Sequence, residues 1–134
     1  MAGMPRQPQR RPRPTPRTAL GTRAEAAVVA WLRERGVQIL GSNVRAGRLE
    51  VDVLARDGEV VLVVEVRTRG RGAWQRALDS IDGKKQMRLR HAGERLWQKR
   101  FAQRSDVSRM RFDCASVTFS ESGEATIEYV KAAF

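Results

Sequence analysis

Apolar residues alternate with other residues on both sides of Asp57-Gly58, over the stretch from Arg48 to Arg67. Alternation of this kind is typical of β-strands, and an Asp-Gly pair between two alternating runs is a strong hairpin signal. Valine dominates both runs, as expected of strands with little exposed surface. The pattern therefore predicts a β-hairpin around which the rest of the chain is organised.

The periodicity on either side of this hairpin predicts two helices and further strands. Apolar residues recur at helical spacing before the hairpin, and Gly36 supplies a stop; a second helical pattern follows a cap at Ser80 or Asp82. The expected elements are a helix over 20–35, a strand over 37–44, the hairpin, a loop over 68–74, a helix to about residue 100, and strands over 110–119 and 125–130. Their order predicts an α/β domain in which helices flank a mixed sheet.

Three acids, Glu50, Asp52 and Glu65, interrupt the apolar pattern of the hairpin. A loop centred on the Asp-Gly pair places Arg56 opposite Glu59 and Glu50 opposite Glu65, so that all three acids share one face of the sheet. Facing like charges destabilise a ladder, and either a raised pKa or a bound cation relieves the repulsion. Carboxylates at this spacing suit Mg²⁺ or Mn²⁺. The alternative is a solvated face on which each acid pairs with an arginine.

Charge divides the chain into two parts. Residues 1–18 contain all five prolines and five arginines but no acid, so this region should be disordered or extended, and residues 19–134 should form the single folded domain. Removing its five charges from the net +11 leaves +6 on the folded part. A polyanionic partner would suit both parts, whereas the alternatives are a solubilising tail and a merely basic surface.

Other features exclude several classes of protein. A single cysteine, Cys114, rules out an internal disulfide and is expected to be a small buried apolar residue. The single histidine, His91, has no recognisable nucleophile beside it. No apolar stretch approaches the roughly 18 residues of a membrane span, so a cytoplasmic protein without membrane contact is expected.

Two groups of cations are candidates for nucleic-acid contact. Arg69 and Arg71 lie in the glycine-containing loop expected after the hairpin, where they could clamp a phosphate strand. Lysines and arginines also follow one face of the second predicted helix, where they could track phosphates or simply form its solvated side. The candidates on this helix are Lys84, Lys85, Arg88, Arg95 and Lys99.

One further acid, Glu25, lies at the edge of the apolar stripe of the first predicted helix. If that stripe packs on the hairpin, Glu25 could reach the three acids. Alternatively, a position near the helix N-terminus favours a glutamate through the helix dipole alone.

The residues and the order of elements resemble the PD-(D/E)xK nuclease superfamily, and most closely its YraN family of bacterial proteins, which is similar to archaeal Holliday-junction resolvases. The resemblance covers about residues 21–117 and implies a restriction-endonuclease-like αβββαβ core. It rests on Glu25, Glu50-Val51-Asp52, Val64-Glu65-Val66-Arg67, Lys84-Lys85 and Arg111-Phe112-Asp113.

The resemblance implies roles for these residues. Asp52 and Glu65 would be ligands of Mg²⁺ or Mn²⁺, Glu25 a further ligand, and Glu50 an accessory acid. The implied reaction is hydrolysis of a DNA phosphodiester bond, in branched DNA among others, and resolvases of this type act as symmetric homodimers.

The chain departs from the superfamily pattern at Leu49, which replaces a glycine, and at Arg67, which replaces a lysine. Arginine stays protonated and offers a fixed cationic fork, so Arg67 could hold a phosphate oxygen but could not help to deprotonate water. Lys84 or Lys85 could substitute if the second helix lies close. Two other functions therefore stay open: a catalytically silent DNA- or RNA-binding protein of the same fold, and an assembly subunit that binds an acidic protein.

Overall fold

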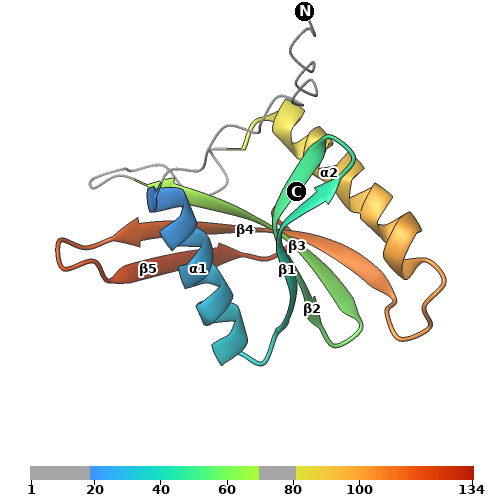
Figure 1. Ribbon diagram of the computed structural model, residues 1–134, viewed down its shortest axis with the longest axis horizontal. Helices are drawn as coiled ribbons and strands as arrows, with labels where there is room; N and C mark the ends of the chain where they lie inside the picture. Colours follow the sequence, from blue (N-terminus) through green and yellow to red (C-terminus); the bar gives the residue numbers. More distant parts are fainter. Residues whose placement is uncertain (1–18, 70–80) are drawn as a thin grey trace, which may run out of the picture.

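The computed structural model describes residues 19–69 and 81–134. Five strands form one sheet in the order β1-β2-β3-β4-β5, with helices packed against it (Figure 1). The elements are α1 (Ala19–Glu34), β1 (Gln38–Ala46), β2 (Leu49–Asp57), β3 (Val60–Arg69), α2 (Gly83–Leu96), the π-helix η2 (Trp97–Phe101), β4 (Arg109–Phe119) and β5 (Ala125–Val130). The expected tail over 1–18, together with Arg71 and Ser80, lies outside the described residues.

The sheet is mixed, because β3 pairs with β4 in parallel while the other neighbouring strands pair antiparallel. Parallel neighbours need a long crossover connection, and here α2 and η2 lie on that connection. The predicted α/β fold with a flanked mixed sheet is confirmed, and the element order is consistent with a restriction-endonuclease-like core. No helix among the described residues has the length and apolarity to cross a membrane.

The two helices cover opposite faces of the sheet, since alternate residues of β2 and β3 enter two separate cores. The core under α1 contains Ala24, Val28, Leu32, Val53, Ala55, Leu62 and Val64. The core under α2 contains Leu54, Val61, Val63, Ala92, Leu96 and Phe101. Because β3 is buried on both faces, it carries the near-continuous valine run from which the hairpin was predicted.

The register of the hairpin differs from the predicted one. Arg56 pairs with Val61 and not with Glu59, because the two-residue turn is Gly58-Glu59 and Asp57 pairs with Val60. Gly58 has a φ of 59°, the pattern of a type II′ turn, which takes glycine at its first central position. The shift is two residues, so the side of the sheet that each β3 residue faces is unchanged, but its partner is not.

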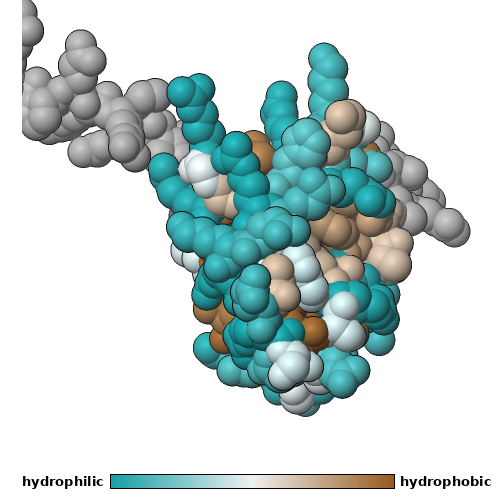
Figure 2. Space-filling model, turned by 90° about the vertical axis from the view of Figure 1, so that its right-hand side faces the viewer, coloured by the Kyte–Doolittle hydropathy of each residue, from teal (hydrophilic) through white to brown (hydrophobic). Residues whose placement is uncertain are grey.

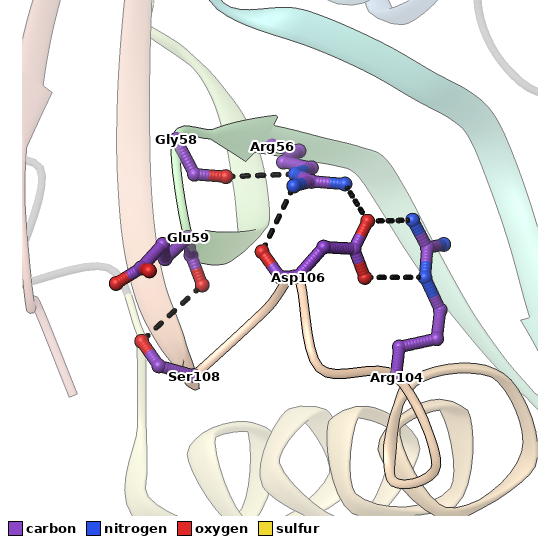
Figure 3. A network of polar contacts seen from close by, with 6 residues as sticks. All are labelled: Arg56, Gly58, Glu59, Arg104, Asp106 and Ser108. Atoms are coloured by element: carbon purple, nitrogen blue, oxygen red, sulfur yellow. Dashed lines mark hydrogen bonds and ion pairs between the residues drawn. The ribbon is translucent and has the colours of Figure 1, made fainter.

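The turn is fixed by a polar network that links it to the segment before β4 (Figure 3). The Arg56 guanidinium donates from Nε to the Gly58 carbonyl at 2.7 Å and from Nη1 to Asp106 Oδ2 at 2.7 Å. Arg104 binds both oxygens of the same Asp106 carboxylate, and the two guanidinium groups hold the pKa of that carboxyl well below its ordinary value. The Ser108 amide donates to the Glu59 carbonyl at 2.8 Å. These bonds hold the turn in its observed register.

The strand that precedes the loop predicted over 68–74 is longer than expected. Thr68 pairs with Val117 and Arg69 with Thr118, so both residues belong to β3. Backbone pairing with β4 extends the strand past the last valine, a tertiary effect that the local sequence pattern does not contain.

Candidate active site

Asp52 and Glu65 lie side by side on β2 and β3. Val53 pairs with Val64, and Asp52 and Glu65 follow directly beyond the end of this pairing. Asp52 Oδ2 accepts a hydrogen bond from the amide of Val66 at 2.9 Å, and the two carboxyl groups also interact with each other. Two of the three predicted acids are therefore brought together, through a register different from the predicted one.

The environment of Glu65 opposes its ionisation. Glu65 is only 3% exposed, and burial, followed by the negative charge of Asp52, raises its pKa from 4.5 to about 7. Lys85 acts against this rise, with its Nζ 2.7 Å from Glu65 Oε1; Arg67 Nε lies 3.5 Å from the same oxygen. Lys85 is the cation with the stronger influence on Glu65, because it both hydrogen-bonds and pairs with the carboxylate.

The cap of α2 positions Lys85. Asp82 Oδ1 accepts from the Lys85 amide at 2.8 Å, which fixes the first turn of the helix, and Ile81 before it is buried. The side chain of Lys85 then reaches Glu65, whereas Lys84 is exposed. Of the two lysines considered as substitutes for the superfamily lysine, Lys85 is the one at the site.

A pocket of about 320 Å³ opens at this point, where α1, β2, β3 and α2 meet. Glu25 of α1 lines it together with the carboxylate pair, so of the two alternatives for this residue the structure shows the one in which it lies near the acids. The lining residues are Gly21, Glu25, Asp52, Glu65, Val66, Arg67, Thr68 and Lys85.

Glu50 does not join this group. Val51 packs in the core under α2, whereas Val53 packs under α1, so β2 rotates sharply at Asp52. Asn43, at the facing position of β1, has a left-handed φ of 56° and marks the same kink. In the strand register Glu50 lies opposite Arg45 of β1, and it does not line the pocket. The prediction that Glu50 faces Glu65 is therefore wrong.

The carboxylate pair suits an ion such as Mg²⁺, which does not need a complete set of protein ligands. Within residues 19–69 and 81–134, no three or more histidine, cysteine, aspartate or glutamate side chains are grouped to hold a metal. Mg²⁺ keeps several of its waters and commonly uses one or two carboxylates together with substrate phosphates. Asp52 and Glu65, adjacent and repelling each other, match that requirement, and a divalent cation would relieve the repulsion.

The predicted nucleic-acid residues fall into three groups. Arg69 donates from Nε to Ser116 Oγ at 2.8 Å and so lies against β4, while Arg71 is outside the described residues. Lys85 is engaged with Glu65. The remaining cations lie exposed along α2 and its continuation; they are Lys84, Arg88, Arg95 and Lys99.

Comparison with known proteins places the chain in a family. The model of Uncharacterised protein family UPF0102 matches residues 24–117, which run from α1 to β4. The chain belongs to the UPF0102 family. The matched range includes all the charged residues that line the pocket.

Several UPF0102 proteins are similar over most of their length. One from Sorangium cellulosum is 62% identical over 118 residues, covering 88% of this chain and 82% of its own. One from Anaeromyxobacter dehalogenans is 41% identical, covering 88% and 85%. The UPF0102 protein YraN of Salmonella newport is 36% identical, covering 88% and 86%. The predicted membership of the YraN family is confirmed.

Sequence reasoning missed one feature of the pocket, the bond from the Val66 amide to Asp52, and left a second one open, which of Lys84 and Lys85 reaches Glu65. The first follows from a backbone group, which carries no side-chain signature. The second joins residues on different elements, and only the double lysine that opens α2 pointed toward it.

Proposed function

We propose that this UPF0102 protein is a metal-dependent nuclease that hydrolyses phosphodiester bonds in nucleic acid, with DNA as the leading substrate. One observation carries the proposal: Asp52 and Glu65 stand side by side in a pocket that also contains a lysine amine. The resemblance to the PD-(D/E)xK nucleases supports it, because that superfamily carries metal-binding acids on the corresponding strands in the same order of elements.

Asp52 and Glu65 would hold the metal ion, Mg²⁺ or Mn²⁺. Such an ion, when bound, lowers the pKa of a water molecule and stabilises negative charge on the phosphate. Asp52 is held in place by the Val66 amide, so one ligand is oriented before any ion arrives. Glu25 contributes a third carboxylate to the wall of the pocket.

Lys85 would supply the amine that the superfamily carries on β3. Its Nζ lies 2.7 Å from Glu65, so it is already at the site, although it comes from α2. Arg67 would then be left with a different role, since a guanidinium fork suits a phosphate oxygen better than it suits proton transfer. In this scheme the arginine at the lysine position does not abolish catalysis.

A second candidate function is favoured by the same ion pair. Lys85 offsets the charge of Glu65 without any metal. In a catalytically silent nucleic-acid-binding protein, this pair would be structural and the pocket would bind no cation. The two candidate functions give opposite results in a metal titration.

The test combines calorimetry with a cleavage assay. Titration of the protein with MnCl₂ should show binding that Asp52→Asn abolishes, and supercoiled plasmid and branched DNA should be cut in the presence of Mn²⁺. Loss of a metal ligand should lower the cleavage rate about a hundredfold or more. Glu59→Gln is the matched control, because Glu59 is an exposed acid at the far end of the hairpin; its rate should stay within about twofold of wild type.

Two lysine variants test the role of Lys85. Lys85→Met removes a charge-assisted hydrogen bond, worth about 1.5–3 kcal/mol, and should lower kcat about tenfold to a hundredfold with saturating DNA. Lys84→Met, one residue earlier and exposed, should leave kcat nearly unchanged. Absence of manganese binding in the wild type would refute the nuclease and leave the silent binding protein.

A further inference from the structure

A second cavity lies away from the carboxylate pocket, between the β1–β2 turn and the outer part of α2. Its volume is about 1600 Å³, larger than the roughly 300–1,000 Å³ of small-molecule sites. The residues that line it are Arg45, Ala46, Gly47, Arg48, Leu49, His91, Glu94, Arg95, Leu96, Gln98 and Lys99. We call it the hairpin cleft, after the hairpin formed by β1 and β2. None of its residues lines the pocket that contains Asp52 and Glu65, which we call the carboxylate pocket.

The hairpin cleft carries a strong excess of positive charge. Four of its lining residues are permanent cations and only one, Glu94, is an acid. The cations come from both walls: Arg45 and Arg48 from the hairpin, Arg95 and Lys99 from the helical side. None of these four cations forms an ion pair with another described residue. The ion pairs among the described residues involve Arg56, Arg67, Lys85, Arg104 and Arg111.

The two walls are in contact at the turn. Gly47 has a φ of 66°, and a side chain there would collide with Arg95 Nη1, so a glycine allows the guanidinium to lie directly on the turn. This contact places a cation of α2 directly against the β1–β2 turn, beside Arg48. Figure 2 shows the α2 side of the molecule, where hydrophilic side chains cover most of the surface.

We infer that the hairpin cleft binds the phosphodiester backbone of a nucleic-acid strand. Phosphates along a strand form a row of negative charges, which matches cations presented from two sides of an open cleft. The cationic face of α2 also leads from the cleft toward the carboxylate pocket, by way of Arg88 and Lys85. The inference extends the proposed function to a second surface. It rests on that function only for the claim that the bound strand is the substrate.

The experiment measures binding without catalysis. Fluorescence anisotropy of a labelled DNA duplex is followed at several salt concentrations in EDTA, so that no cutting occurs. Arg48→Ala with Lys99→Ala removes one cation from each wall and should weaken binding about tenfold, with the log–log salt slope lowered by nearly 2, about 0.9 for each lost phosphate contact.

The matched control removes two exposed cations outside the cleft, by Arg33→Ala with Lys131→Ala. Its total charge equals that of the cleft variant, and its affinity should stay within about twofold of wild type. All four side chains are exposed, so both variants should fold, which circular dichroism checks.

Three results would overturn the inference: equal weakening in the two double variants, no weakening in either, or tighter binding to poly-glutamate than to DNA. Tighter binding to an RNA duplex, lost in the cleft variant, would support the cleft and identify RNA as the source of the phosphates. Failure of the nuclease proposal would appear instead in the manganese titration, which these variants leave unchanged.

Discussion

Glu65 is subject to two opposing influences that decide the character of the site. Burial and the neighbouring Asp52 favour its protonated form, and Lys85 favours its charged form. The first influence prevails in the metal-free protein, since the pKa of Glu65 rises to about 7. A divalent ion beside the two carboxylates would reverse the balance, because it stabilises both as anions.

The raised pKa of Glu65 predicts how the stability of the metal-free protein depends on pH. Between pH 4.5 and about 7 the folded state holds a proton that the unfolded chain has released, so the free energy of unfolding should fall as pH rises through this window. The loss should be at most about 3 kcal/mol. Asp106, whose pKa is lowered, acts at more acidic pH and does not affect this range.

Urea denaturation in EDTA at several pH values would measure this effect. Glu65→Gln should flatten the dependence, because glutamine does not titrate, whereas Glu59→Gln should leave it as in wild type. A free energy of unfolding that rises from pH 5 to pH 7 in the wild type would contradict the prediction.

At the scale of elements, the packing of α2 against the sheet sets the position of Lys85. Gly93 lies in the middle of that contact, and a β-carbon there would come within 2.6 Å of Phe112 Cζ and 2.9 Å of Met110 Sδ. The side chains of Phe112 and Met110 can lie directly against the helix here because position 93 has no side chain.

Gly93→Ala should therefore destabilise the protein, although alanine favours helices. Overpacking costs about 1–3 kcal/mol, against a gain in helix propensity of about 1 kcal/mol. Gly83→Ala is the control, since a β-carbon at the start of α2 would meet no atom within 4 Å. Urea midpoints should fall for Gly93→Ala and stay or rise for Gly83→Ala; an equal response of the two variants would contradict the packing argument.

At the scale of the whole molecule, α2 connects the carboxylate pocket to the hairpin cleft. Lys85 and Arg95 are ten residues apart on this helix, which corresponds to about 15 Å at 1.5 Å per residue. Phosphates of one DNA strand advance by about 3.4 Å per base pair along the axis, so this distance spans about four to five base pairs. If both proposals hold, a substrate must extend that far from the cutting position on one side.

Duplexes shortened from one end should show this requirement. Affinity should fall about tenfold when the arm over the cleft becomes shorter than about five base pairs, and Arg48→Ala with Lys99→Ala should remove the length dependence. Shortening the other arm serves as the control. A dependence that is the same for both arms, or that persists in the cleft variant, would count against a strand running along α2.

The sequence by itself determined most of the elements of this protein, because hydrophobic periodicity and turn residues act locally. The valine runs predicted β2 and β3, the stripe with Val28 and Leu32 predicted α1, and Asp82 predicted the start of α2. The identity of the central acids, Asp52 and Glu65, was also visible in the sequence, since acids inside an apolar strand pattern need a partner.

Only the tertiary structure decided which of these residues meet. The turn is centred one residue later than predicted, because Gly58 adopts a positive φ and Arg56 is held by Asp106. Each pairing therefore moves by two residues, which puts Asp52 beside Glu65 just beyond the Val53–Val64 pair. The rotation of β2 at Asp52 removed Glu50 from the site, and the packing of α2 brought in Lys85. Register, strand twist and helix packing depend on contacts between distant segments, so a pattern read along one segment does not contain them.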